Sequence, residues 1–361
     1  MPEITQNTLH LTTAGTYVAR DHLTLQVEVP LYPDDLPGED RSRATRSGIR
    51  TVAIPIHHLE SICVFGPSTV SPPALDLCWE HGVSVNYLSE WGRLQARLTG
   101  VADTSVSLRR LQFRAADDPR KSIAIARQFI AGKLQNARNS LLRAGRENPQ
   151  NTERERIDEV TEAMARQIRD LPSQLSLESL RGAEGLAAAT YFSVFSLALK
   201  QQRLEFEFLT RSRRPPRDRI NCLLSFLYAL VRHDCVSALT AAGLDPFVGY
   251  LHAERPNRPA LALDLMEEFR PWLADRLALT LINRQQIGVS DFKEREGGSV
   301  EFTEIGRKRV IKAYQERKME ALNHPLLDQN YRVAQIPFLQ ARILARHLRG
   351  DLANYLPFIP K

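Results

Sequence analysis

The sequence predicts an α+β fold, in which a small N-terminal β-strand domain (residues 1–105) precedes a larger α-helical domain (106–345) and a C-terminal tail (346–361). Three observations support this prediction. The length of 361 residues corresponds to roughly two domains at about 100–200 residues each. Apolar and polar residues alternate near the N-terminus, as they do in half-buried strands. From residue 118 onward, apolar residues recur at the spacing of one helix face.

Composition restricts the class of protein further. Hydrophobic residues make up 43% and charged residues 25% of the chain, as in average globular proteins, which excludes a disordered or collagen-like chain. The four cysteines include no Cys-x-x-Cys pair, so we expect no zinc ribbon and instead small buried thiols in a reducing compartment. The net charge of +6 permits a nucleic-acid partner without proving one.

The sequence contains no segment that we expect to enter a membrane. Its first residues lack the basic and apolar regions of a signal peptide. The most apolar stretch, Ile220 to Val231, is shorter than the about 20 residues that cross a bilayer, and it contains Asn221 and Ser225. The sequence therefore predicts a soluble, cytoplasmic protein without a membrane partner.

Short strands and one helix are expected in the β domain. Alternation and turn residues predict strands over residues 23–29, 83–88 and 93–98. The turn Ser89–Gly92 joins the last two strands as a hairpin. Ser71 and Pro72 suit an N-cap and a first helical position, so a helix is expected to run from there to about Glu80. Residues 30–50 are rich in proline, glycine and charge, and are most simply a mobile loop.

The helical domain is expected to contain five helices. Asp118 and Pro119 supply the N-cap and the first position of the first helix, and Gly145 supplies its end. Four later helices are expected to begin near Thr152, at Ser176, after Asp218 and after Pro259. The chain is therefore expected to change from strands to helices between its two domains.

Three carboxylates in the last of these helices are candidate ligands of a cation. Asp264, Glu267 and Glu268 are spaced i, i+3 and i+4, so they can share one helix face, where each pair repels by roughly a few tenths of a kcal/mol. A bound cation would reverse the sign of that energy. Pro271 is expected to kink the helix one turn beyond Glu267. The alternative is an ordinary solvated acidic face.

A glutamate and a histidine elsewhere complete the candidate site. Glu184 lies in a predicted helix otherwise built of Ala, Leu and Gly, where Gly182 and Gly185 each cost about 1 kcal/mol relative to Ala. Close packing or the close approach of a ligand would compensate for that cost, and a solvent-exposed Glu beside a helix crossing is the alternative. His252 alone is more often a structural residue. Together with the carboxylates, these residues suit Mn²⁺ or Mg²⁺.

Arginines near these positions suit a phosphodiester substrate. They are Arg181, Arg255, Arg258 and Arg270. A metal ion would polarise the phosphoryl oxygen while arginines neutralise nearby phosphates. Residues 211–219 hold five arginines, among them Arg213 and Arg214, which would either grip a nucleic-acid backbone or form a solvated loop before the helix cap Asp218. Tyr228, on the following apolar helix, is by default a core residue with one satisfied hydroxyl.

In their shared order and spacing, the motifs of this chain resemble those of the CRISPR-associated spacer-acquisition integrase and endonuclease family, and the resemblance suggests subtype I-C. The matching segments are Ile54–Gly66, Ser71–Leu75, Gly82–Leu88, Gly92-Arg93, Gln112, Lys133, Asn136–Arg138, Arg181–Gly185, Pro216, Asp218–Tyr228, Gly243–Pro246, Gly249–His252 and Asp264–Pro271. The resemblance implies a homodimer, whose N-terminal β domains provide dimer and partner contacts and whose helical domains are catalytic and metal-dependent.

The resemblance also implies roles for single residues. The metal-binding positions of the family fall on Glu184, His252 and Glu267, the last of which is Asp in some members. Asp264 falls at the first of the paired acidic positions, where it would support the site or bind a second ion, so these four residues form the implied catalytic set. Tyr228 and Arg270 fall beside the catalytic centre, as further candidates for DNA contact.

The implied reaction is DNA integration. The 3′-hydroxyl of a short foreign duplex attacks a phosphodiester at the leader end of a CRISPR repeat, and a second attack at the far end completes insertion, with Mn²⁺ or Mg²⁺ at the scissile phosphate. The implied partners are double-stranded DNA, a second copy of the chain and a small ferredoxin-like CRISPR-associated protein. Two alternatives stay open: a structure-selective nuclease acting on branched DNA in repair, and a non-catalytic DNA-binding subunit. The segment from Tyr355 would be a docking segment or a frayed terminus.

Overall fold

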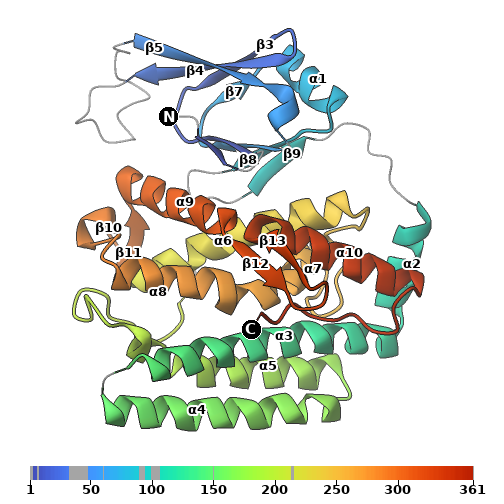
Figure 1. Ribbon diagram of the computed structural model, residues 1–361, viewed down its shortest axis with the longest axis vertical. Helices are drawn as coiled ribbons and strands as arrows, with labels where there is room; N and C mark the ends of the chain where they lie inside the picture. The colour runs from blue at the N-terminus through green and yellow to red at the C-terminus, as the bar shows by residue number, and fades with distance from the viewer. Residues whose placement is uncertain are drawn as a thin grey trace. The chain divides into compact units, whose positions relative to one another are not determined.

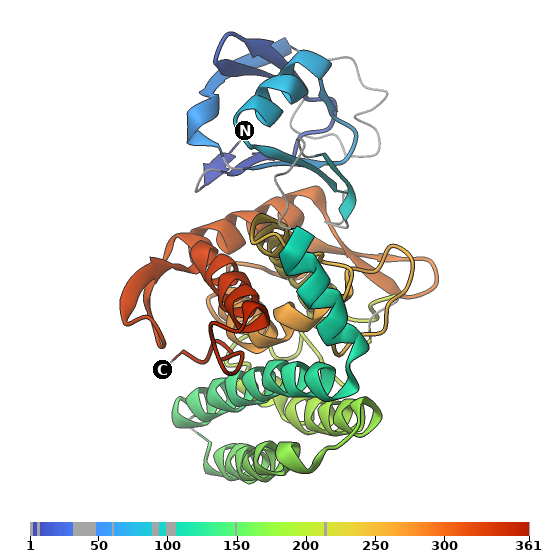
Figure 2. The same ribbon diagram turned by 90° about the vertical axis from the view of Figure 1, so that its right-hand side faces the viewer.

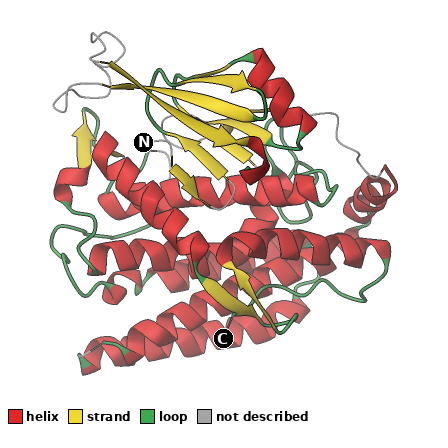
Figure 3. Cartoon of the chain, turned by 45° about the horizontal axis from the view of Figure 1, so that its top comes forward, coloured by secondary structure: helices red, strands yellow, loops and turns green. Residues whose placement is uncertain are grey.

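The computed structural model divides the chain into two compact units, Met1–Asp103 and Thr104–Lys361. The residues that it describes are 3–5, 8–31, 48–59, 61–88, 94–98, 106–148, 150–212 and 215–360. Figure 1 labels the elements, and Figure 3 shows that strands dominate the first unit and helices the second. The predicted α+β class, with a small β domain before a larger helical domain, is therefore confirmed.

Two sheets and one helix form the N-terminal unit. The strands are β1 (Glu3–Thr5), β2 (Thr8–Leu11), β3 (Tyr17–Asp21), β4 (Thr24–Leu31), β5 (Gly48–Pro55), β6 (Ser61–Phe65), β7 (Thr69–Val70), β8 (Ser84–Leu88) and β9 (Leu94–Leu98), and the helix is α1 (Pro72–Glu80). The sheet orders are β1-β2-β6-β8-β9 and β5-β4-β3-β7. Leu25, Val27, Ile62 and Leu77 come from both sheets and α1, and they are fully buried in one shared core.

The local predictions for this unit agree with the structure where the two can be compared. β4 overlaps the predicted strand 23–29, and β8 pairs antiparallel with β9 as in the predicted hairpin. The Ser71 hydroxyl caps α1 by accepting a hydrogen bond from the backbone N–H of Ala74. Residues 89–92 of the hairpin turn and 32–47 of the predicted loop lie outside the described residues.

The second unit is mainly helical. Its helices are α2 (Val106–Asp117), α3 (Pro119–Arg146), α4 (Asn151–Asp170), α5 (Leu177–Phe192), α6 (Arg219–Ala241), α7 (Ala260–Leu265), α8 (Arg276–Asn283), α9 (Glu304–Met319) and α10 (Ile336–Arg349). Two hairpins join β10 (Phe292–Arg295) to β11 (Ser299–Phe302) and β12 (Ala321–His324) to β13 (Gln329–Arg332). α3 packs against α4 and α5, and the three helices lie side by side (Figures 1 and 2).

Helix starts were predicted better than helix number. Asp118, Ser176 and Asp218 each accept a backbone hydrogen bond at the start of α3, α5 and α6, respectively, as their residue types predict. α4 begins at Asn151, one residue before the predicted start. The sequence prediction missed α2, α9, α10 and both hairpins, so five expected helices were too few.

α6 is the apolar core helix of this unit. Its segment Arg219–Thr240 is long and apolar enough to cross a membrane by length and composition alone, so the expectation that this stretch is too short was wrong. However, 67% of that segment's most apolar window is buried inside the protein. The apolar composition of α6 is therefore explained by its burial in the core of this unit.

The last predicted helix is broken in the middle. α7 ends at Leu265, a 3₁₀ turn covers Met266–Glu268, and a π-helical segment spans Arg270–Asp275 before α8 begins. Pro271 has no N–H to offer the Glu267 carbonyl, so the regular ladder of hydrogen bonds cannot continue there. The predicted kink is confirmed, but the break is larger than predicted because the helix changes type on both sides of it.

The C-terminal segment packs into the helical unit. α10 ends at Gly350, whose φ of 90° is the left-handed conformation common after the last helical residue. Further on, Tyr355 is 1% exposed and Phe358 is 0% exposed. A frayed terminus is therefore the wrong description of this segment.

Candidate functional site

Four side chains from four separate segments meet at the broken helix. Lys133 extends from α3, Glu184 from α5, His252 from the loop after α6, and Glu267 from the 3₁₀ turn, and we call these residues the Lys133 cluster. The Lys133 ammonium forms ion pairs with Glu184 Oε1 and, at 2.7 Å, with Glu267 Oε2. His252 Nε2 lies 3.9 Å from Glu267 Oε1. The structure thus brings together three residues that the sequence reasoning selected.

Asp264 supports this cluster from behind. Its fully buried carboxylate accepts hydrogen bonds from the backbone N–H groups of Tyr250, Leu251 and His252, at 2.6, 3.0 and 3.0 Å. Its Oδ1 also lies 2.6 Å from His252 Nδ1. A proton on Nδ1 that is bonded to Asp264 leaves the Nε2 lone pair free for a metal ion. Because its oxygens are already engaged, the geometry favours support over the binding of a second ion.

Gly249 permits the loop to approach this carboxylate. A Cβ atom at position 249 would lie 2.8 Å from Asp264 Oδ2 and 2.8 Å from the carbonyl carbon of Ala260. Neither distance leaves room for a methyl group beside buried atoms. The glycine that opens the segment Gly249–His252 is therefore required by close packing of backbone against Asp264.

Glu267 stays ionised although it is buried. Burial alone raises the pKa of its carboxyl group, but the neighbouring charges, chiefly those of Arg270 and Lys133, lower that pKa from its ordinary value of 4.5 to about 2. Arg270 NH1 lies 3.2 Å from Glu267 Oε1. Because the folded pKa is below the unfolded one, this stabilisation is present above pH 4.5 and is lost as pH falls towards 2. At neutral pH the carboxylate is therefore able to bind a cation.

The residue types of the cluster fit a divalent metal ion. Two carboxylates and an imidazole with a free Nε2 suit Mn²⁺ or Mg²⁺. Glu267 Oε2 is buried and, within the described residues, accepts no hydrogen bond of good geometry, so its charge is balanced by the ion pair with Lys133. That ammonium contacts both carboxylates, and no three His, Cys, Asp or Glu side chains of the described chain stand close enough to hold an ion. The position between Glu184 and Glu267 thus already holds a positive charge.

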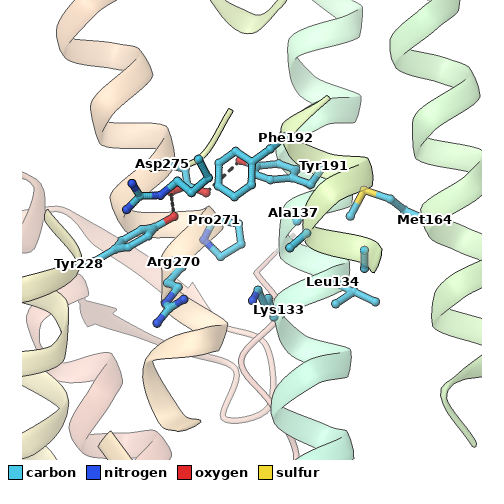
Figure 4. Close-up of a pocket in the computed structure, with 13 residues that line it drawn as sticks. Lys133, Leu134, Ala137, Met164, Tyr191, Phe192, Tyr228, Arg270, Pro271 and Asp275 are labelled. Carbon is cyan, nitrogen blue, oxygen red and sulfur yellow. Dashed lines mark hydrogen bonds between the residues drawn. The ribbon is translucent and has the colours of Figure 1, made fainter. Parts of the chain in front are cut away.

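Tyr228 and Arg270 belong to a second network beside the Lys133 cluster (Figure 4). The Tyr228 ring lies between two guanidinium groups, 5.3 Å from that of Arg211 and 5.0 Å from that of Arg270. Its hydroxyl donates to Asp275 Oδ1 at 2.7 Å, and the Tyr191 hydroxyl donates to Oδ2 at 3.0 Å. Burial raises the pKa of Asp275 to about 6. The default interpretation of Tyr228, a packed ring with a satisfied hydroxyl, is confirmed, and its contact with Arg270 links it to the cluster.

Sequence reasoning missed several residues of this site. Lys133 was included in a matching segment, but nothing in the sequence indicates that it contacts Glu184, because their contact is tertiary. Asp275 and Tyr191 were not selected at all. Asp275 had a usable signal, because it is the only carboxylate in the mostly apolar stretch 271–282.

The predicted arginines have different surroundings. Arg181 donates from Nε and NH2 to the carbonyl oxygen of Leu251, at 2.8 and 2.5 Å, and so holds the loop that carries His252. Arg255 is exposed and Arg258 is half-buried on the same loop. Arg181 is itself exposed, so its contact with Leu251 leaves it within reach of a partner in solution.

The arginine-rich segment 211–219 is partly used by the protein itself. Arg211 bonds to Asn221 Oδ1, Arg217 to the Gly297 carbonyl, and Arg219 to the Glu205 carbonyl. These contacts favour the structural alternative for those three arginines. Arg213 and Arg214 lie outside the described residues.

Gly182 and Gly185 form an open face on α5 on either side of Glu184. Both glycines are exposed, and a Cβ atom at either position would meet no heavy atom of the described chain within 4 Å. Close packing inside this unit therefore does not explain two helix-destabilising residues. The open space leaves room for the close approach of a ligand, and it is equally compatible with a solvent-exposed face.

Comparison with known sequences identifies the family. Residues 9–316 match the family described as CRISPR associated protein Cas1. The chain is 43% identical to CRISPR-associated endonuclease Cas1 1 of Moorella thermoacetica, over 98% of each chain. It is 42% identical to CRISPR-associated endonuclease Cas1 1 of Chlorobaculum tepidum, again over 98% of each chain.

Solved structures share the fold. A casposase bound to integration product is similar with a TM-score of 0.82 at 21% identity, covering 97% of this chain and 92% of that chain. A CAS1 protein from Thermotoga maritima is similar with a TM-score of 0.75 at 22% identity, covering 98% of this chain and 100% of that one. From the sequence matches and this shared fold, we conclude that the chain belongs to the Cas1 family of CRISPR-associated endonucleases.

Proposed function

We propose that this chain is a metal-dependent DNA endonuclease and integrase that inserts short foreign duplexes into a CRISPR array. The observation that carries the proposal is that Glu184 and Glu267 share one cationic position, held by the Lys133 ammonium, while His252 Nε2 lies 3.9 Å from Glu267 Oε1 and Asp264 orients His252. Membership of the Cas1 family supports a CRISPR-associated nuclease. Strand joining distinguishes an integrase from a nuclease that only cleaves DNA.

In this proposal the metal ligands are Glu184, Glu267 and His252 Nε2, and the ion is Mn²⁺ or Mg²⁺. When bound, the ion would polarise the scissile phosphate and stabilise the charge on the leaving oxygen. Asp264 keeps the proton on His252 Nδ1, so Nε2 faces the ion as an electron-pair donor. Arg270 places a further positive charge next to Glu267, where a phosphate would otherwise be repelled.

DNA approaches over the open face of α5. The glycines at positions 182 and 185 allow a backbone to come close to Glu184 without a steric clash. Candidate phosphate contacts are Arg255, Arg258, Arg213 and Arg214. The 3′-hydroxyl of one strand attacks the phosphodiester, one P–O bond forms as another breaks, and the leaving strand takes the proton, so no external energy source is required.

The proposed assembly contains a second copy of the chain and a small ferredoxin-like CRISPR-associated partner, with the N-terminal units forming the dimer and partner contacts. A solved assembly described as a Cas6-RT-Cas1–Cas2 complex contains this fold with a TM-score of 0.76 at 23% identity, covering 100% of this chain and 37% of that one. Its named composition supports a Cas partner here. We also propose that the protein belongs to subtype I-C and is located in the cytoplasm. The identity of the genes next to its own would test the subtype.

A strand-joining assay tests the proposed function. The chain and its small partner would be mixed with a labelled duplex bearing free 3′-hydroxyls, a supercoiled plasmid carrying the array, and Mn²⁺. Glu184→Gln and His252→Ala are expected to lose joined product at the repeat boundary by a factor of at least about 100, because each removes a metal ligand. Glu178→Gln, at an exposed acidic position in the first turn of the same helix, is the matched control and should join like the wild type.

The other outcomes separate the alternatives. Cleavage of branched DNA without any joining, by the wild type with its partner, would favour the repair nuclease. Joining that survives both ligand substitutions would place the active site elsewhere. DNA binding without metal-dependent chemistry in any condition would favour the non-catalytic subunit.

A further inference from the structure

Glu268 is a fully buried carboxylate next to the proposed metal ligand Glu267. Whereas Glu267 contacts Lys133 and Arg270, Glu268 contacts the C-terminal segment and Gln340 of α10, whose side-chain nitrogen donates to Oε2 at 3.1 Å. Glu268 Oε1 accepts from the Tyr355 hydroxyl at 2.5 Å, and its Oε2 accepts from the backbone N–H of Phe358 at 2.7 Å. The two consecutive carboxylates of this short turn therefore bind different parts of the helical unit.

Asn136 joins the same segment to α3. Its side-chain amide nitrogen donates one hydrogen bond to the Glu268 carbonyl and one to the Phe358 carbonyl, both at 2.8 Å. A Cβ atom at Gly132 would lie 2.7 Å from Pro357 Cβ, so the segment rests directly on the helix. Lys133 extends from this same stretch of α3. The C-terminal segment and the Lys133 cluster are thus held by one part of one helix.

Aromatic packing completes the attachment. Phe358 is 0% exposed and its ring centre lies 4.9 Å from that of Trp272 and 6.1 Å from that of Phe269. The Tyr355 ring centre lies 4.9 Å from that of Phe129. The segment therefore fills the core behind the turn that carries Glu267, on both sides of Glu268.

We propose that residues 355–360 act as an intramolecular clasp that sets the direction of the Glu267 carboxylate, with Glu268 as a positioning residue. The turn over Met266–Glu268 is only a 3₁₀ turn, and Pro271 removes the helical hydrogen bond that would otherwise fix the Glu267 carbonyl. Its conformation therefore depends on what holds Glu268. The clasp rests on the proposed function in one respect, which is that Glu267 binds the metal ion.

The same observations decide against a docking role for this segment's aromatic residues. Tyr355 and Phe358 are already buried in the helical unit, so they are not available to a partner without leaving its core. Leu356, between them, is 43% exposed. The family match ends at residue 316, before the segment begins.

A pair of tyrosine substitutions tests the clasp. Tyr355→Phe removes the hydroxyl that binds Glu268, and Tyr314→Phe removes a buried hydroxyl that binds the carboxylate of Asp234 instead, at 2.6 Å. Each substitution removes one buried hydrogen bond to a carboxylate, and Tyr355→Phe also removes the bond that the hydroxyl accepts from Gln340 Nε2 at 2.9 Å. Both variants should therefore lose thermal stability. Only Tyr355→Phe is expected to bind Mn²⁺ about tenfold more weakly in calorimetric titration. A loss of that size is typical when a residue that orients a metal ligand is mutated. Its kcat for joining should fall while its KM for DNA stays unchanged.

A truncation and a rescue give a second measurement. A chain ending at Asn354 should lose Mn²⁺ binding, and a synthetic peptide of residues 355–361 should restore it, whereas the exposed-site variant Leu356→Ala should behave like the wild type. Equal Mn²⁺ affinity in Tyr355→Phe, Tyr314→Phe and the wild type would overturn the clasp. So would a truncated chain that binds Mn²⁺ normally and fails only with its partner, which would make the segment a docking element. Absence of Mn²⁺ binding in the wild type would instead refute the proposed function.

Discussion

Lys133 holds a positive charge between the two carboxylates of the proposed metal site. Its ammonium engages oxygens of Glu184 and Glu267, so it competes with an ion for those oxygens and repels the ion as well. Lys133→Met keeps most of the side-chain volume without the charge. We expect this variant to bind Mn²⁺ more tightly, and its metal-free form to unfold at a lower temperature because Glu267 loses a buried partner. Calorimetric titration and thermal unfolding measure the two effects.

Lys121→Met is the control for this substitution, since Lys121 is an exposed lysine on the same helix. It should change neither the Mn²⁺ affinity nor the unfolding temperature appreciably. If Lys133→Met bound Mn²⁺ more weakly than the wild type, the lysine would support the ion rather than compete with it.

Single residues of the site were predictable to different degrees. The motifs selected Glu184, His252 and Glu267, and the structure brings them together. They did not show that Asp264 accepts hydrogen bonds from the loop that carries His252. The i, i+3 spacing of Asp264 and Glu267 on a regular helix predicts instead that the two side chains share one face. The break in the helix sends the two side chains to different neighbours. Pro271 indicates the break locally, but the neighbours that each side chain then meets are tertiary contacts that no local pattern contains.

At the scale of elements, α5 combines low intrinsic helix stability with an open face. Gly185→Ala would reduce the backbone entropy lost on folding and meets no atom of the described chain, so it is expected to stabilise the protein by about 0.5–1 kcal/mol. The added methyl group would stand where DNA approaches, so DNA affinity should fall. Thermal unfolding and a DNA-binding titration measure the two opposite changes.

The opposite signs make this prediction informative. Higher stability with unchanged DNA affinity would mean that the glycine face does not meet the substrate. Lower stability would mean that the surroundings of position 185 are closer than the structure shows.

Elements with local signals were the predictable ones. The caps at Asp118, Ser176 and Asp218 are local hydrogen bonds between a side chain and the next turn, so the sequence alone indicates them. α9 was missed because it is rich in charged residues and buries few apolar ones along its length. The strands of the two hairpins have four residues each, which is too short for alternation to be distinctive.

At the scale of the whole molecule, the proposed chemistry lies in one of the two compact units. Every residue of the Lys133 cluster and of the C-terminal clasp belongs to the unit Thr104–Lys361. A chain that begins at Thr104 is therefore expected to fold, to bind Mn²⁺ like the full chain, and to lose the proposed dimer. Circular dichroism, calorimetric titration and light scattering check these three points. Loss of helical signal would mean that the helical unit needs the N-terminal unit to fold.

The division into two units could be predicted because the apolar period changes from that of strands to that of helices. How distant segments meet could not be predicted in the same way. The segment after α10 illustrates the limit, since Tyr355 and Phe358 are ordinary apolar residues near the end of the sequence, and nothing local pairs them with Glu268. Contacts of this kind are chosen by packing and by the need to satisfy buried polar groups.

The hydrogen bond between Glu268 and Phe358 joins residues that are 90 positions apart. Closing so long a stretch of chain costs conformational entropy, whereas the hydrogen bonds within α3 and α5 join near neighbours in the sequence. The turn that carries Glu267 is therefore expected to become ordered later in folding than the helices that carry Lys133 and Glu184.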